Sequence, residues 1–199
     1  MELINKQKLI NKGNKKGRKI ACDIIEYTLN NLDPYKKTKQ IINREGNIIE
    51  IKNQKFNLDK INNIYIIGAG KATYPIARAL EEILQEKITK GLVILKGNYK
   101  ENLKYIDIIN ASHPLPDKMS LQGAKEILKI VDNSQKDDIV FSIMTGGSSS
   151  LMVYPPKGIT LNELKELNKI LLYSGANIYE INTIRKHISR VKGGKLAEH

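Results

Sequence analysis

The sequence has 199 residues, 41% of them hydrophobic and 27% charged, which is the composition of a folded globular chain and excludes an intrinsically disordered one. Cys22 is the only cysteine, so the sequence excludes an intrachain disulfide and a zinc site built from several cysteines, and no apolar run approaches the roughly 20 residues that cross a bilayer. The formal net charge of +12 comes from lysines spread along the chain and, with 6% aromatic residues and no nucleic-acid-binding motif, it does not indicate a nucleic-acid partner.

The first third of the chain predicts helix followed by a hairpin. Apolar residues at helical spacing predict a helix over residues 3 to 32, interrupted at Gly13 and Gly17. Asp33-Pro34 ends it, because the residue before a proline is pushed out of helical geometry. The stretch NREGNIIEIKNQKFNL predicts a hairpin or edge strand at the margin of a sheet.

From Ile64 onward, strands and helices alternate. Strands are predicted over 64–68, 91–95, 105–111 and 138–144. The last of these is a continuous apolar run, which is typical of a strand covered on both faces. A helix follows the first strand, with Thr73 as its predicted N-cap and Pro75 in its first turn, and another covers 118–132.

The C-terminal part predicts two more helices. Thr160 and Glu163 form a capping box before the first, which Ser174-Gly175 ends. The second runs through Ile178 to Val191 and stops at Gly193-Gly194.

This alternation predicts one Rossmann-like layered α/β domain over residues 1–199. It has a mostly parallel sheet, helices on both faces, and extra N-terminal and C-terminal helices. Ligands of such sheets bind outside the carboxyl ends of the strands, so candidate functional residues are sought there.

The stretch GAGKAT, residues 68–73, follows the first buried strand. Gly68 and Gly70 allow a tight turn whose N–H groups could face an anion beside Lys71. A dinucleotide-binding motif would need glycine at Thr73, and a Walker A loop would need Ser or Thr at Ala72, so neither pattern is satisfied. The alternative is a tight turn with a solvated lysine.

Two further loops follow predicted strands. MTGGSSSL carries hydrogen-bond donors suited to a phosphate or carboxylate, and its alternative is a flexible polar turn. The candidate residues of this loop are Gly146, Gly147, Ser148, Ser149 and Ser150. In ASHPLPDK, two prolines stiffen a loop that orients His113 and Asp117; either residue could bind a ligand, and Asp117 could instead cap the following helix.

The stretch EINTIRKHISRVKGGK places polar residues on one helix. Asn182, Arg185, Ser189 and Lys192 recur at intervals of three and four, so they are predicted to share one face that could bind an anion. The alternative is a solvated surface. His187 lies between apolar positions, which favours a packed or hydrogen-bonded histidine.

Four stretches, GAGKA, SHPLPD, GGSSSL and SGANIYEINTIRKHISRVKGGKLA, together resemble the amino-terminal portion of the glycerate 2-kinases, the MOFRL-containing kinases sometimes labelled hydroxypyruvate reductase. The resemblance implies phosphorylation of D-glycerate at its 2-hydroxyl by ATP with Mg²⁺, giving 2-phosphoglycerate. It also implies a cleft between two domains, with Lys71 as a catalytic residue. The Asn-x-x-Arg-Lys-His motif maps to Asn182, Arg185, Lys186 and His187, and Arg185 could bind the glycerate carboxylate.

The sequence departs from this family in two ways. The family commonly has Ser-Gly-Gly-Gly-Ser-Ala in its loop, whereas Thr145 and Ser148 stand here at the first and fourth places. Members also continue with an aspartate-rich segment, a Ser-Gly-Pro-Thr segment and the MOFRL region, none of which this sequence contains. Metal ligands would come from those aspartates, so none is assigned here. A homodimer or a complementing chain that supplies the missing half is expected.

Two alternatives remain. A NAD(P)-dependent hydroxypyruvate reductase would need an acidic residue after the strand 91–95, where the sequence has Lys96, Gly97 and Asn98. The chain could also be an inactive fragment or binding module that keeps the fold. In each case we expect a cytoplasmic protein with a small-molecule substrate, and no membrane or nucleic-acid partner.

Overall fold

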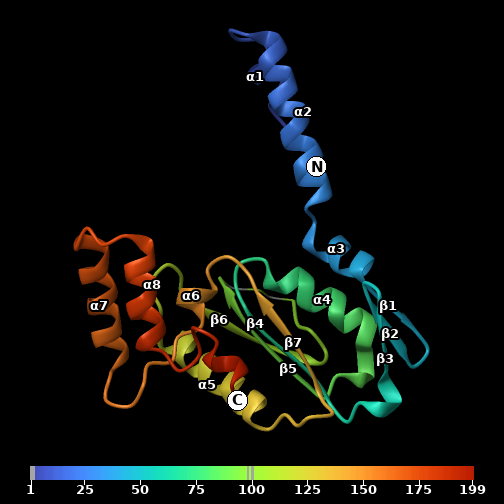
Figure 1. The fold of residues 1–199 in the computed structure, drawn as a ribbon. Coiled ribbons are helices and arrows are strands. Elements are labelled where there is room, and N and C mark those ends of the chain that lie inside the picture. Colours follow the sequence, from blue (N-terminus) through green and yellow to red (C-terminus); the bar gives the residue numbers. More distant parts are fainter. Residues whose placement is uncertain (1–2, 98, 100) are drawn as a thin grey trace.

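The structure is a computed structural model that describes residues 3–97, 99 and 101–199 (Figure 1). The helices are α1 (Lys6–Ile10), α2 (Lys15–Asn31), α3 (Pro34–Ile41), α4 (Thr73–Leu84), α5 (Lys118–Asp132), α6 (Ser148–Leu151), α7 (Leu161–Tyr173) and α8 (Ile178–His187), with short 3-10 turns η1 (Leu58–Lys60), η2 (Gln85–Lys87) and η3 (Lys195–Ala197). The strands are β1 (Ile42–Glu45), β2 (Ile48–Ile51), β3 (Gln54–Asn57), β4 (Ile64–Ala69), β5 (Lys90–Lys96), β6 (Ile106–Ala111) and β7 (Ile139–Met144).

The main sheet has four parallel strands in the order β6-β5-β4-β7. Parallel strands need crossover connections, and helix α4 lies between β4 and β5 in the chain and α5 between β6 and β7. All six residues of the inner strand β4 are buried. The prediction of an α/β fold with a parallel sheet is therefore confirmed.

Helices α4 and α5 cover opposite faces of this sheet. Successive side chains of a strand point to opposite faces, so Ile66 packs with Leu80 and Leu84 of α4, whereas Ile67 packs with Ile127 of α5. Each face thus has its own hydrophobic cluster. The carboxyl ends of the strands remain between the two layers, where β4 leads into α4 and β7 leads into α6.

The strand β7 differs from the prediction. Residues 138–144 were expected to be covered on both faces, but β7 lies at an edge of the sheet and half-buried residues alternate with exposed ones along most of it. Val140 is 37% and Met144 43% exposed. The prediction was wrong because an apolar run does not specify which faces of a strand other elements cover.

The predicted hairpin is also placed differently. Strands β1, β2 and β3 form a separate antiparallel sheet instead of a margin of the main sheet. Ile49 of β2 is fully buried and belongs to the α4 cluster, so this small sheet covers part of the α4 layer. Helix α3 was not predicted; Asp33 caps it by accepting from Tyr35 N and Lys36 N, and Pro34 occupies its first position.

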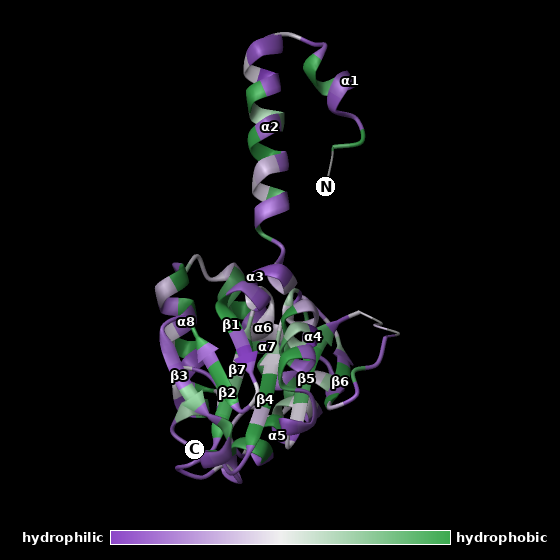
Figure 2. Ribbon diagram, turned by 90° about the vertical axis from the view of Figure 1, so that its right-hand side faces the viewer, coloured by the Kyte–Doolittle hydropathy of each residue, from purple (hydrophilic) through white to green (hydrophobic). Residues whose placement is uncertain are grey.

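Helices α1 and α2 project from the body as an arm in both views (Figures 1 and 2). The predicted interruption occurs at Gly13, which has φ +58° between the two helices, whereas Gly17 lies inside α2. The Lys6 ammonium joins the helices through Asp23 and Glu26, at 2.7 and 2.5 Å. Among the described residues, no helix is long and apolar enough to span a membrane.

Candidate functional site

The loops after β4 and β7 pack directly against each other. The backbone N–H groups of Gly70, Lys71 and Ala72 donate to Ile94 O, Gly146 O and Thr145 Oγ1, at 3.1, 2.9 and 3.2 Å. The turn was predicted to present N–H groups to an anion, but these three are engaged within the fold. Adjacent strands place both loops at one edge of the sheet, so the loop after β7 accepts from Lys71 and Ala72, and β5 accepts from Gly70.

The glycines of this turn are explained by the close approach of the loops. A Cβ atom on Gly70 would lie 1.9 Å from Thr145 Oγ1, and one on Gly68 would lie 2.6 Å from Ile143 O. Gly70 also has φ +139°, which side chains rarely adopt. Thr73, the predicted N-cap of α4, is its first helical residue instead, and its hydroxyl lies 3.0 Å from that of Thr145.

The structure brings Lys71 and His113 together around Gly147. A Cβ atom at Gly147 would lie 2.9 Å from His113 Cδ2 and 3.3 Å from Lys71 Cε. Glycine is needed here for this contact and for φ +93°. Burial lowers the pKa of the His113 imidazole below its usual value, and the nearby ammonium groups of Lys71 and Lys96 lower it further. At pH 7 this imidazole is therefore mainly neutral.

The glycine-serine loop offers hydrogen-bond donors. Among the described residues, no acceptor is found for the N–H groups of Gly146 and Gly147 or for the hydroxyls of Ser148 and Ser149. The Ser150 hydroxyl lies 3.4 Å from Gly147 O. This supply of donors beside Lys71 suits an anionic or polar ligand.

Arg185 is held from α7. Its Nε donates to Asn168 Oδ1 at 2.7 Å, and the Asn168 amide donates to Leu164 O at 2.8 Å. Within the part of the chain that the structure describes, no partner is found for the two terminal guanidinium nitrogens. They remain able to bind a carboxylate or phosphate in a bidentate manner.

Lys192 lies beside Arg185. Its ammonium donates to Met152 O at 2.7 Å, which holds it against the segment that follows α6. Burial, together with repulsion from the Arg185 guanidinium, lowers the pKa of Lys192 to about 8. An anion bound between these two cations would relieve the repulsion.

The polar residues of the last motif do not share one helix as predicted, because α8 ends at His187. The Lys195 ammonium accounts for this end: it donates to the carbonyls of Lys186, His187 and Ser189 at 3.1, 3.2 and 2.8 Å. The Ser189 hydroxyl accepts from the next turn, from Val191 N and Lys192 N. A lysine side chain thus satisfies carbonyl groups that further helical turns would have satisfied.

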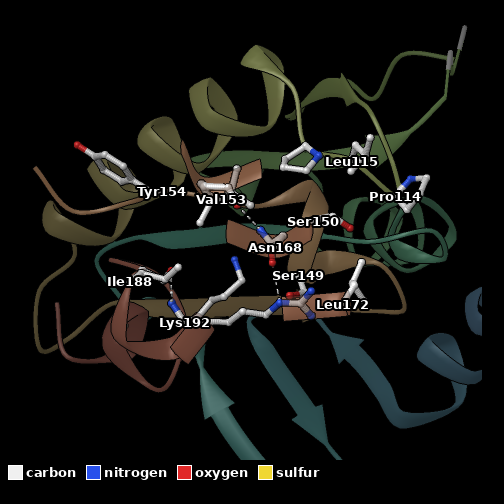
Figure 3. A pocket seen from close by; sticks show the side chains of 14 residues that line it. Pro114, Leu115, Ser149, Ser150, Val153, Tyr154, Asn168, Leu172, Ile188 and Lys192 are labelled. Atoms are coloured by element: carbon white, nitrogen blue, oxygen red, sulfur yellow. Dashed lines mark hydrogen bonds between the residues drawn. The ribbon is translucent and has the colours of Figure 1, made fainter. Parts of the chain in front are cut away.

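Two neighbouring cavities, of about 350 and 270 Å³, nevertheless collect these residues. Ser149, Arg185 and Lys192 line both of them. Ser150 and Ser189 line only the larger cavity, and Asn182 and Lys186 line only the smaller one. Figure 3 shows Lys192 and Ser149 on one side of the larger cavity, with Pro114 and Leu115 on the opposite side.

Two candidate residues have structural roles. Asp117 caps α5 by accepting from Ser120 N at 2.9 Å and also accepts from Ser112 N at 3.2 Å. Burial raises the pKa of the Asp117 carboxyl, but these hydrogen bonds outweigh that effect and hold the pKa below its usual value. His187 is exposed, and its Nδ1 lies 2.8 Å from Thr183 O.

The cations of the site have no carboxylate partner in the described part of the chain. No ion pair within 4 Å involves Lys71, Arg185 or Lys192 there, and no group of three or more His, Cys, Asp or Glu side chains could hold a metal ion. The cationic residues present therefore suit phosphate or carboxylate groups.

Sequence reasoning missed two residues that organise the site. The Thr145 hydroxyl joins the two loops, and Asn168 orients Arg185 from a helix that carried no motif. A polar residue after a strand was a signal for Thr145. Asn168 gave no comparable signal, because its contact spans 17 positions between two helices.

Comparison with known proteins places this geometry in a family. The model of a domain of unknown function, DUF4147, matches residues 20–199. The chain belongs to the DUF4147 family. It is 40% identical over 181 residues to a glycerate 2-kinase of Pyrococcus horikoshii, covering 91% of this chain and 40% of that protein. It is also 43% identical over 133 residues to a putative hydroxypyruvate reductase of Agrobacterium vitis, covering 67% and 34% of the two chains.

A crystal structure of a similar protein has the same fold over the matched part. It is the glycerate kinase of Thermotoga maritima, with a TM-score of 0.75 and 34% identity, covering 90% of this chain and 40% of that one. The chain thus spans about 40% of the length of the Pyrococcus horikoshii and Thermotoga maritima relatives. The matched part contains Lys71, His113, the glycine-serine loop and the cavities beside α8.

Proposed function

We propose that this chain is the N-terminal portion of a glycerate 2-kinase, which transfers the γ-phosphoryl group of ATP to the 2-hydroxyl of D-glycerate and yields 2-phosphoglycerate and ADP. One observation carries the proposal: Lys71, the neutral His113 and the donors of the glycine-serine loop meet around Gly147, without a carboxylate partner for Lys71 among the described residues. The names of the relatives give the reaction class.

The chemistry asks little of the protein beyond position and charge. The 2-hydroxyl oxygen of glycerate bonds to the γ-phosphorus as the bond to the β-phosphate oxygen breaks, and ADP leaves. Lys71 would stabilise negative charge on the transferring phosphoryl group. The 2-hydroxyl proton needs an acceptor, and the neutral imidazole of His113 beside Lys71 would take it.

Arg185 and Lys192 would bind a second anionic group. Their cationic groups fit either the glycerate carboxylate or phosphates of ATP. Magnesium, when bound together with ATP, would supply positive charge that neutralises the phosphates.

The proposal includes a second polypeptide portion. Because the relatives are longer than the matched region, the glycerate-binding cleft would be completed by a further segment, a complementing chain or a second copy. The test measures ADP formation from ATP and D-glycerate by the 199-residue chain alone and mixed with the remaining portion of the Pyrococcus horikoshii relative. We expect glycerate-dependent ADP in the mixture.

The same experiment separates the alternatives. Absence of ADP in both samples, with intact folding by circular dichroism, would identify a binding module instead of a kinase. Oxidation of NADH or NADPH by hydroxypyruvate in the mixture would support the reductase. The only observation in its favour is the name of the Agrobacterium vitis relative. Strand β5 ends at the basic Lys96, where ribose binding by a reductase would need a carboxylate. Asn98, which follows it in the sequence, lies outside the described residues.

A further inference from the structure

The larger cavity beside α8 has an apolar part that a hydroxy acid would not use. Eight of the fourteen residues that line it are apolar: Pro114, Leu115, Pro116, Val153, Tyr154, Leu164, Leu172 and Ile188. Leu115 and Leu172 are 63% and 68% exposed, whereas Val153 and Leu164 are buried. The cavity is therefore open to solvent beside Leu115 and Leu172 and closed by Val153 and Leu164.

The polar part of the same cavity is cationic. Arg185 and Lys192 line it together with the Ser149 and Ser150 side chains, and no carboxylate is among the lining residues. Asn168 also lines the cavity, but its side chain already accepts a hydrogen bond from Arg185 and donates one to Leu164 O. A matching ligand therefore has an apolar body and a negative charge at one end.

Glycerate does not have this shape. Each of its three carbon atoms carries oxygen, so apolar walls offer it no favourable contact. A nucleotide does: the faces of its base are apolar, and its phosphates are anionic. A volume of about 350 Å³ is near the lower end of the roughly 300–1,000 Å³ of small-molecule sites, which suits a base and ribose with the first phosphate at the cationic end.

The position of the serines connects the cavity to Lys71. Ser149 and Ser150 line the cavity, and Gly147, in the same loop, touches Lys71 and His113. A phosphate chain that leaves the cavity past Ser149 would therefore run along this loop towards Lys71.

We propose that this cavity binds the base and ribose of ATP, with Arg185 and Lys192 on its phosphates. This placement rests on the kinase function proposed above. Glycerate then occupies the side of the loop near Lys71 and His113. The lowered pKa of Lys192 agrees with this placement, because it reflects a buried cation without an anion beside it.

The test is nucleotide binding by the 199-residue chain, measured by isothermal titration calorimetry. Leu172→Glu places a negative charge at the cavity, and Ile170→Glu, on the same helix at 62% exposure and outside the cavity lining, is the matched control. We expect Leu172→Glu to weaken ATP binding at least tenfold and Ile170→Glu less than twofold. Both variants should keep the wild-type melting temperature, because both positions are exposed.

A second pair of measurements separates base from charge. Lys192→Met should weaken ATP at least fivefold and adenosine less than twofold. Inorganic tripolyphosphate carries the charge without the base. Its dissociation constant, measured by competition with ATP, should therefore be at least tenfold higher than that of ATP. Three results would overturn the placement. They are equal ATP affinity of the two glutamate variants, tripolyphosphate binding as tightly as ATP, and no ATP binding by the wild-type chain at millimolar concentration. Failure of the kinase proposal is seen separately, as no glycerate-dependent ADP in the reconstituted mixture.

Discussion

Two groups of charged residues in this chain differ in where their partners lie. On α4, the Glu82 carboxylate accepts from the Tyr35 hydroxyl and binds Lys39 at 2.6 Å and Arg78 at 3.1 Å. Around the glycine-serine loop, Lys71 and Arg185 have no carboxylate partner in the described residues. The first group joins α3 to α4, so its charges have a structural role. The second group has no such partner among the described residues, so its cations are available to an anionic ligand.

The pKa values express the same difference. Hydrogen bonds from Lys39 and Tyr35 lower the pKa of Glu82 to about 2, so its charged form is stabilised within the fold. Burial and repulsion lower the pKa of Lys192 to about 8, so its charged form is destabilised until an anion binds. The two effects on the charged form are thus opposite: Glu82 is satisfied within the fold, whereas an anion beside Lys192 would stabilise its charge.

The strongest test of this comparison is Lys71→Met. In the reconstituted mixture we expect glycerate-dependent ADP formation to fall by about 100- to 1,000-fold, because a cation aimed at developing phosphoryl charge is lost. The melting temperature should not change, because Lys71 is exposed and supports no ion pair. The control is Lys157→Met, at an exposed loop position remote from this loop in the sequence. Normal activity of Lys71→Met, or a large loss of stability, would contradict its assignment to the site.

A second test concerns the contact between the two loops. Gly70→Ala should lower the free energy of unfolding by about 2–4 kcal/mol, because the new Cβ would meet Thr145 and require an unfavourable φ. Gly146→Ala is the matched control: nothing lies within 4 Å of its Cβ position, so we expect a change within about 0.5 kcal/mol. Urea unfolding measures both. Equal effects would mean that the loops are not packed as described.

The third test asks whether a carboxylate near the cationic site is structural. Asp117→Ala should cost about 1–2 kcal/mol of stability because it removes the cap of α5. Asp117→Asn should keep most of that stability, since asparagine caps helices as well as aspartate does. Denaturant unfolding of the two variants at pH 7 is the measurement. A large loss with asparagine would show instead that the second carboxylate oxygen, which accepts from Ser112 N, is also needed.

The smallest expected effect is that of Glu82→Gln. At pH 7 we expect a loss of about 0.5–1 kcal/mol, because the ion pairs are partly exposed. The folded-state pKa of about 2 lies below the usual 4.5, so the stabilisation is complete above pH 4.5 and disappears as the pH falls towards 2. Thermal melts from pH 7 to pH 2 follow it. Glu166→Gln, an exposed position on α7, is the control; if its pH profile is the same as that of Glu82→Gln, the contrast between the two charged groups fails.

Much of the fold was predictable because it depends on local patterns. Helix α5 has the predicted bounds, and the capping box of Thr160 and Glu163 begins α7 as expected. The end of α8 was not predictable from its apolar spacing, because the Lys195 side chain satisfies the terminal carbonyls from eight or nine positions away. The separate small sheet was missed for a similar reason, since hairpin pattern does not specify which layer the hairpin covers.

Residue type and spacing alone were enough to select the candidate residues: Lys71 after a glycine turn, His113 in a proline loop, the serines after a strand, and Arg185 with Lys192 near the C-terminal end. Only the tertiary structure decided which of them meet. It brought His113 to Lys71, used the backbone of the glycine turn for packing, and assigned Asp117 to a helix cap. The physical reason is that residue type and spacing set local geometry, whereas contacts between loops depend on strand order, which no single segment encodes.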